Sequence, residues 1–278
     1  MNGRAMSLKA KIRNFANEKD ISAQVVLQNY MFERFIERLS KSDYKNNFIL
    51  KGGILIASIV GIDKRSTMDM DATIKNYPLD ITSLSKAVKN ICDIVIQDNV
   101  KFEYLGIEPI RKDDAYGGFR VSLQANYDTI LTTLQIDMTT GDEITPKEIL
   151  YLYKKIINNE TIDVWAYNIE TVLAEKVESI LNRGELNTRP RDFYDVYILS
   201  KTQVFDTMVF IKALRNTAEH RKTTHIFENI KNRIEKIENS KSLELLWIKY
   251  TKNYRYAKDI AYINVIESLK LLIFKEEK

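Results

Sequence analysis

Two aspartates lie two residues apart at the end of the stretch KGGILIASIVGIDKRSTMDMD, which spans residues 51–71. Side chains at positions i and i+2 of a strand point to the same face, so Asp69 and Asp71 are expected to project together, opposite the buried Met70. Two carboxylates this close repel each other unless a cation lies between them. Magnesium accepts oxygen ligands and commonly combines one or two protein carboxylates with substrate phosphates. The pair predicts chemistry on a metal-bound phosphate, although a lone Asp-x-Asp is more often a solvated turn.

A third acid, Asp137, lies in the alternating run LQIDM of residues 134–138. The apolar residues of this run share one face of the predicted strand, which places Asp137 on the opposite face. If this strand neighbours the strand that carries Asp69 and Asp71, the three acids converge. Such a carboxylate triad can hold two metal ions about 3.5–4 Å apart for in-line phosphoryl displacement. We therefore predict Asp69, Asp71 and Asp137 as catalytic residues and metal ligands.

Two glycines stand at the other end of the same stretch, directly after Lys51. A glycine pair alone commonly marks a turn. Here Gly52 and Gly53 precede an apolar run that can form a buried helix, whose N-terminus favours an anion. Because glycine lacks a Cβ, the backbone can approach a phosphate closely. We therefore predict a phosphate site at Lys51, Gly52 and Gly53, to which Arg65 and Thr67 contribute from the segment before the aspartates.

The elements that position these residues follow from apolar periodicity. Helical spacing predicts helices over residues 22–40, capped by Ser22, and near residues 80–90. Strands are expected at residues 48–50 and 68–74, and period-two alternation predicts three more, around residues 100–104, 119–123 and 134–138. After about residue 165 only helices are expected, at residues 170–182, 191–200, 206–216, 225–239, 243–256 and 260–274. The fold class is therefore α+β over residues 1–166, followed by an all-helical lobe over residues 167–278.

Composition limits the classes of protein to which the chain can belong. The 278 residues are 45% hydrophobic and 29% charged, as in a globular protein with a full core, and the net charge is +4. One cysteine, Cys92, permits no internal disulfide and no cysteine-cluster zinc site. No apolar run reaches the roughly 20 residues of a membrane helix, and the first residues show no secretory signal. We expect a cytoplasmic protein without membrane contact, and a monomer.

The predicted helical lobe carries further charged candidates whose plain interpretations are structural. Lys176 borders an apolar helical stripe and is, on its own, more typical of a surface lysine whose stem packs on that stripe. Asp192 lies in the first turn of a helix opened by Pro190, where an aspartate can simply complement the helix dipole. Residues 247–258, WIKYTKNYRYAK, interleave aromatic and cationic side chains. They can stack bases and contact phosphates, or the aromatic rings can be partly core.

In their order, these segments resemble the nucleotidyltransferase superfamily signature, in which a helix-opening glycine pair precedes Asp-x-Asp and a later strand carboxylate. Gly53 stands where many members of the superfamily carry serine. More specifically, the chain resembles the AbiEii/AbiGii family, the abortive-infection toxins of type IV toxin–antitoxin systems. The resemblance spans most of the chain and rests on FILKGG (48–53), RSTMDMD (65–71), LQIDM (134–138), IETVLAEKVESIL (169–181), RPRDFYDVYIL (189–199) and WIKYTKNYRYAKDI (247–260).

The resemblance implies a nucleotidyltransferase-fold mixed sheet in the first lobe and a helical lobe that completes the nucleotide site. It implies that Lys176 faces the nucleotide and that Asp192 is essential for positioning, by pairing with Lys176. By the same resemblance, Arg191 is a phosphate-binding candidate and Asp195 a structural residue. The implied cofactor is Mg²⁺ or Mn²⁺, with an NTP as the substrate.

The implied function is that of a phage-defence toxin that moves an NMP from an NTP to an RNA acceptor, such as the 3′ end of tRNA, and so blocks translation and growth. The cognate antitoxin is expected to act without a stable complex. Two alternatives stay open at this point. The same triad would serve transfer to a protein (AMPylation) or to a small molecule such as an antibiotic, because the acceptor class lies outside the triad. The second alternative is a toxin that binds an NTP without catalysis.

Overall fold

The computed structural model describes residues 3–110, 117–158 and 160–274. The chain divides into two compact units. The first contains the residues up to Gly141 together with Ile149–Ala166, and the second contains Asp142–Glu148 and the residues from Tyr167 onward. No helix of the described residues is long and apolar enough to cross a membrane.

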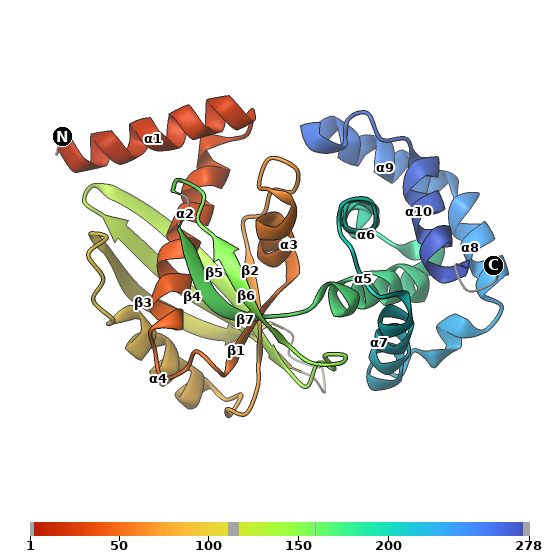
Figure 1. Ribbon diagram of the computed structural model, residues 1–278, viewed down its shortest axis with the longest axis horizontal. Coiled ribbons are helices and arrows are strands. Elements are labelled where there is room, and N and C mark those ends of the chain that lie inside the picture. The colour runs from red at the N-terminus through yellow and green to blue at the C-terminus, as the bar shows by residue number, and fades with distance from the viewer. Residues whose placement is uncertain (1–2, 111–116, 159, 275–278) are drawn as a thin grey trace. The chain divides into compact units, whose positions relative to one another are not determined.

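The first unit is built around a mixed β-sheet (Figure 1). Its strand order is β3-β4-β5-β2-β1-β7-β6, in which β2 pairs parallel with β5 and β1 pairs parallel with β7. The other neighbours pair antiparallel. The elements of this unit are α1 (Gly3–Lys19), α2 (Ala23–Ser40), β1 (Phe48–Lys51), α3 (Gly52–Val60), β2 (Met70–Ile74), α4 (Ile81–Cys92), β3 (Val100–Pro109), β4 (Phe119–Tyr127), β5 (Ile130–Thr140), β6 (Ile149–Lys154) and β7 (Thr161–Ala166).

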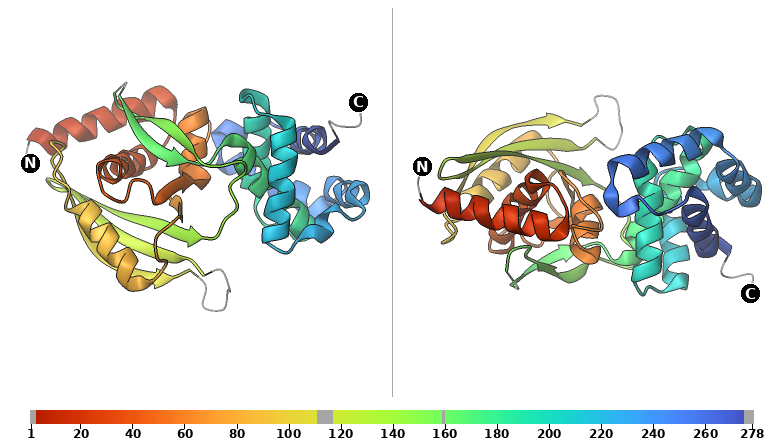
Figure 2. Two further views of the ribbon diagram at one scale, coloured as in Figure 1. Left: turned by 60° about the horizontal axis from the view of Figure 1, so that its bottom comes forward. Right: turned by 90° about the horizontal axis from the view of Figure 1, so that it is seen from above.

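Helices α2 and α4 cover one face of the sheet, and α1 packs on α2 (Figures 1 and 2). The rings of Phe35 on α2 and Phe102 on β3 meet edge to face at 5.9 Å. The alternating apolar residues of β2, β4 and β5 are almost fully buried on this face. Because side chains alternate along a strand, the intervening polar residues must lie on the opposite face. The core therefore fixes which face of the sheet carries the charged side chains.

Most elements expected from the sequence are present in the first unit. Ser22 caps α2 by accepting a hydrogen bond from the Gln24 backbone, and Asp80 caps α4 through Ser83 N. Helix α1 was not expected, because two of its four buried residues are alanines and its apolar stripe is weak. Strands β6 and β7 were also missed. The sequence ILYLYK of β6 is apolar on both faces of an edge strand, so it shows no alternation.

The second unit consists of helices and loops in its described residues (Figure 2). A helix expected over residues 225–239 is interrupted at Asn229, which has a positive φ of 50°. The elements of this unit are α5 (Ile169–Arg183), η1 (Gly184–Leu186), α6 (Pro190–Thr202), α7 (Thr207–His220), η2 (Thr224–Phe227), α8 (Ile230–Glu238), α9 (Lys241–Asn253), η3 (Arg255–Ala257) and α10 (Tyr262–Phe274).

The segment Asp142–Glu148 belongs to the helical unit because it is bonded to its helices. The backbone N–H of Thr145 donates to Thr171 Oγ1 at 3.0 Å, and the Thr145 carbonyl accepts from Asn168 Nδ2 at 2.9 Å. Asn216 on α7 donates to the Thr145 hydroxyl at 2.9 Å. These bonds hold the segment against α5 and α7.

Candidate active site

The parallel pairing of β2 with β5 brings two of the predicted acids together. Asp71 on β2 lies directly opposite Asp137 on β5 in the register. Opposed residues of neighbouring strands share a face, so both carboxylates leave the sheet on the side away from α2 and α4. The condition that the two strands are neighbours is therefore met, and the register pairs Asp137 with Asp71.

The same register continues across the sheet as a line of charged residues. Glu108, Arg120, Asp137, Asp71 and Lys51 lie opposite one another on β3, β4, β5, β2 and β1. We call these five residues the charged row. Their signs alternate except at the centre, where the two aspartates are adjacent. The row thus concentrates negative charge on the middle strands, next to the start of α3.

Asp69 is placed by a loop rather than by the strand. The strand expected over residues 68–74 begins at Met70 instead, so Asp69 precedes it and is exposed. The Thr67 hydroxyl donates to the Asp69 carbonyl at 3.2 Å and accepts from the Asp69 N–H at 3.4 Å. Asn29 on α2 donates to the Thr67 carbonyl at 2.8 Å. These local bonds replace strand pairing and anchor the loop to the helix behind it.

Gly52 lies against the carboxylate of Asp71. It has φ +66°, which L-residues with a Cβ rarely adopt, and a Cβ built on it would come 2.7 Å from Asp71 Cγ and 2.9 Å from Asp71 Cβ. Glycine at this position therefore allows Asp71 to pack on the first residue of α3. The side chain of the N-cap residue, Lys51, makes no capping hydrogen bond, and the N-terminal N–H groups of a helix suit an anion.

Gly53 faces the two residues that were predicted to touch phosphate. A Cβ at Gly53 would come 2.8 Å from Thr67 Oγ1 and 3.1 Å from a guanidinium nitrogen of Arg65. Arg65 is buried, with 2% of its surface exposed, and donates to the Ser66 carbonyl at 2.6 Å. Thr67 is buried as well. Both side chains therefore support the loop before Asp69, and their contact with a nucleotide stays a prediction.

Arg120 is a site residue that the sequence interpretation missed. Its Nε donates to Asp137 Oδ1 at 2.7 Å and its Nη2 to Asp137 Oδ2 at 2.8 Å. These hydrogen bonds raise the pKa of the Arg120 guanidinium above its ordinary value, and the charges of Asp69 and Glu108 act in the same direction. The sequence FRVSLQANY of β4 alternates polar and apolar residues, so nothing in it distinguishes Arg120 from the other polar residues of the strand. Only the pairing of β4 with β5 shows its partner.

Two of the predicted acids offer the kind of ligand that the predicted divalent metal requires. Carboxylate oxygens of Asp69 and Asp71 suit Mg²⁺ or Mn²⁺, because these cations need only one or two protein carboxylates when phosphates supply other ligands. No group of three or more His, Cys, Asp or Glu side chains is arranged to hold a metal in the part of the chain that the structure describes. Asp137 is engaged by Arg120 at both oxygens. The residues present therefore fit a metal at Asp69 and Asp71.

The helical unit contains a second cluster, formed where α5 meets α6. Lys176 Nζ donates to Asp192 Oδ1 at 2.7 Å and lies 3.2 Å from Asp195 Oδ2. Ser179 donates to the other oxygen of Asp192 at 3.2 Å. Asp192 and Asp195 are both buried, so the cluster is an internal one. The expected pairing of Lys176 with Asp192 is present, and Asp195 joins it.

A pocket of about 440 Å³ lies beside this cluster, between the start of α6 and α9. Its lining includes Arg189, Arg191, Lys249, Asn253 and Tyr254. Arg191 donates to the Tyr254 hydroxyl at 2.6 Å and lies over its ring, 5.2 Å from the centroid. The pocket thus combines three cationic side chains with two tyrosines, Tyr250 and Tyr254, and with the carboxylate of Asp192.

The aromatic residues of segment 247–258 divide between core and surface. Trp247 and Tyr250 are buried, whereas Tyr254 and Tyr256 are half-buried. The rings of Tyr250 and Tyr254 lie 4.6 Å apart. The core interpretation therefore holds for the first two, and Tyr254 reaches the pocket.

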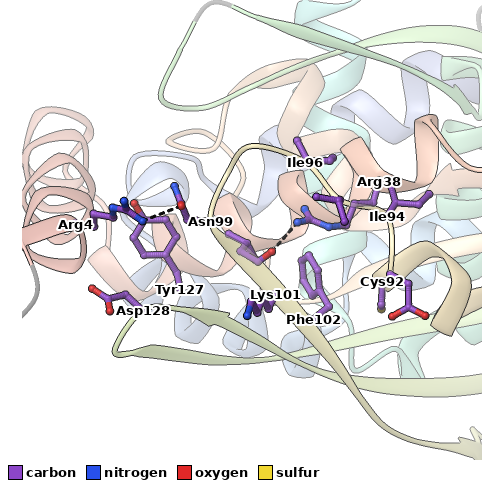
Figure 3. A pocket seen from close by; sticks show the side chains of 13 residues that line it. Arg4, Arg38, Cys92, Ile94, Ile96, Asn99, Lys101, Phe102, Tyr127 and Asp128 are labelled. Atoms are coloured by element: carbon purple, nitrogen blue, oxygen red, sulfur yellow. Dashed lines mark hydrogen bonds between the residues drawn. The ribbon is translucent and has the colours of Figure 1, made fainter.

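A larger cavity of about 520 Å³ lies in the first unit but away from the acids (Figure 3). It lies where Val100 pairs with Tyr127. Val100 is eight residues from Glu108 along β3, so at about 3.3 Å per residue the cavity lies about 26 Å from the charged row. Arg38, which lines it, is bound by Asp98 and by the Val100 carbonyl. Arg4 donates to Asn99 (Figure 3). These polar groups bond one another, and none of the residues predicted to act on a nucleotide lines this cavity.

Two solved structures are similar to this chain. The crystal structure of a proposed nucleotidyltransferase from H. pylori aligns with 92% of this chain and 98% of its own, with a TM-score of 0.52 and 15% identity. JHP933 from Helicobacter pylori aligns with 85% of this chain and 97% of its own, with a TM-score of 0.46 and 15% identity. A comparison with curated proteins gives no match. The first likeness shows a shared fold.

Fold and sequence together define the class as nucleotidyltransferase. The sequence profile described as "Nucleotidyl transferase AbiEii toxin, Type IV TA system" matches residues 34–265. The chain therefore belongs to the AbiEii family of nucleotidyltransferase toxins. The resemblance drawn from the sequence, the α+β fold class and the enzyme class are confirmed.

Proposed function

We propose that this toxin transfers a nucleoside monophosphate from an NTP to the 3′ end of tRNA in a magnesium-dependent reaction, and that the product blocks translation. Growth arrest of this kind would limit phage multiplication in an infected cell. The observation that supports the proposal best is the pairing of Asp71 with Asp137 on neighbouring strands, with Asp71 against Gly52 at the N-terminus of α3.

The chain's own residues supply the positions for the substrate. Gly52 and Gly53 open α3, whose N–H groups are suited to bind phosphate oxygens. Lys51 lies opposite Asp71 in the register and can neutralise phosphate charge. Asp69 and Asp71 would hold the divalent ion, which when bound neutralises the triphosphate and stabilises the leaving pyrophosphate.

The pocket of the helical unit supports a nucleic acid as the acceptor. Arg189, Arg191 and Lys249 provide the cations that phosphates require, and the ring and hydroxyl of Tyr254 hold the Arg191 guanidinium in place. A small-molecule acceptor does not need such a surface. We therefore favour RNA over a protein or an antibiotic.

The test is incubation of the protein with Mg²⁺, each labelled NTP in turn and total bacterial tRNA, with Asp71→Ala as the control. Label in tRNA with the unmodified protein, and none with the variant, is the expected result. Pyrophosphate release without labelled tRNA would move the acceptor to a protein or a small molecule. Neither label nor pyrophosphate would refute the proposed reaction and favour a toxin that only binds nucleotide.

A further inference from the structure

The ion pair between Arg120 and Asp137 is built into the sheet. The two residues lie opposite each other on β4 and β5, and both guanidinium-to-carboxylate bonds are short, at 2.7 and 2.8 Å. This bidentate arrangement fixes the planes of both groups and is the strongest form of a charge-assisted hydrogen bond between side chains. The carboxylate that was predicted as a third metal ligand therefore already has a cationic partner.

The charge balance around the pair favours a single divalent ion. Four carboxylates, those of Glu108, Asp137, Asp71 and Asp69, lie in or beside the charged row. Three cations lie in or beside it as well, Arg120, Lys51 and Arg65, whose guanidinium lies next to Gly53. The excess of one negative charge is less than the charge that a single divalent ion supplies. A second divalent ion at Asp137 would lie next to the guanidinium, and like charges repel in a site that is only partly exposed.

We propose that Arg120 is the built-in second cation of this active site, and that Asp137 is a positioning residue that holds it rather than a metal ligand. One divalent ion then binds at Asp69 and Asp71. Arg120 provides, from the protein itself, positive charge on the same face of the sheet. The inference rests on the metal dependence in the proposed function and specifies it further.

The experiment measures Mn²⁺ binding to the full chain, by the loss of the free-ion electron paramagnetic resonance signal during titration. The unmodified protein is expected to bind one Mn²⁺. Asp71→Asn should weaken binding by at least about tenfold, whereas Asp137→Asn should change the dissociation constant by less than about threefold. Arg120→Gln should add a second ion or tighten binding by about tenfold, because Asp137 is released. Arg120→Lys, which keeps the charge, should still bind one ion.

Folding is checked for each variant by circular dichroism, and the double variant Arg120→Gln, Asp137→Asn provides a matched control. It lacks both the cation and the released carboxylate, so it should again bind one ion. Two Mn²⁺ ions on the unmodified protein, one of which is lost in Asp137→Asn, would overturn this inference and leave the metal dependence intact. Unchanged binding in Arg120→Gln would also overturn it. An unmodified protein that binds no Mn²⁺ would refute both the inference and the metal dependence.

Discussion

Replacement of Gly52 by alanine tests whether the start of α3 fixes the position of Asp71. Two costs are expected. A positive φ of 66° is unfavourable for alanine by about 1–2 kcal/mol. In addition, the new Cβ would come 2.9 Å from Asp71 Cβ and 2.7 Å from its Cγ, whereas ordinary contacts begin at 3.4 Å. Asp71 must therefore recede by 3.4 − 2.9 = 0.5 Å at its Cβ and by 3.4 − 2.7 = 0.7 Å at its Cγ, and its Oδ2, the atom nearest the new Cβ, must move further.

A displacement of this size affects activity more than stability. A misplacement of 1 Å in a catalytic group can reduce the rate on the order of a hundredfold, so Gly52→Ala should reduce transfer by about tenfold to a hundredfold. Its free energy of unfolding should fall by only about 1–3 kcal/mol. The assay pairs urea unfolding with pyrophosphate release from NTP in the presence of bacterial tRNA.

Two other glycines separate the causes. Gly184 has a φ of +52° and open space around its Cβ position, so Gly184→Ala carries the backbone cost alone. Gly106 on β3 also has open space and no such φ, so Gly106→Ala carries neither cost. Both should transfer nucleotide at the normal rate. If Gly52→Ala transfers as fast as Gly184→Ala at equal stability, the proposed contact with Asp71 does not control the reaction.

Two further predictions concern buried charges. Lys176→Met leaves the buried Asp192 and Asp195 without their shared lysine, so the free energy of unfolding measured in urea should fall by about 3 kcal/mol. Asp192→Asn, which leaves Asp195 paired with the lysine, should lower it by only about 1 kcal/mol. Equal losses in the two variants would contradict the shared role of the lysine. Burial raises the pKa of Glu33 to about 8, against the opposing charges of Arg34 and Lys155. The folded protein then holds a proton that the unfolded chain has lost, so stability should fall as pH rises from about 4.5 to about 8. Glu33→Gln should remove this fall in stability between pH 5 and pH 8, as measured by urea unfolding at the two pH values. A variant whose stability falls as much as that of the unmodified protein would contradict the assignment of the proton to Glu33.

The sequence contains enough information to predict the strands that carry the acids. Asp71 and Asp137 each lie between apolar residues that alternate with period two, so their faces follow from the pattern alone. The helix cap at Ser22 was equally legible, because a side-chain oxygen before an apolar run satisfies the first free N–H groups. The cap of α4 at Asp80 was not predicted, although the start of that helix was placed near it.

Other parts of the site depend on pairing between distant segments, which no local pattern encodes. The partner of Asp137 is Arg120, and this follows only from the hairpin of β4 and β5. Likewise, the reason for glycine at position 52 is the carboxylate of Asp71, 19 positions later in the chain. Strand β6 was missed because an edge strand with apolar residues on both faces lacks the periodicity on which prediction depends.

The apolar core and the charged row depend on the same register. A shift of β5 by one residue relative to β2 would turn Asp137 toward α2 and α4 and move Ile136 and Met138 to the charged face. Both changes are costly, since they expose buried apolar surface and bury a carboxylate away from Arg120. The residues that never touch a substrate thus determine which carboxylates meet. For this reason the pairing of Asp71 with Asp137 is as strongly specified as the core of the sheet.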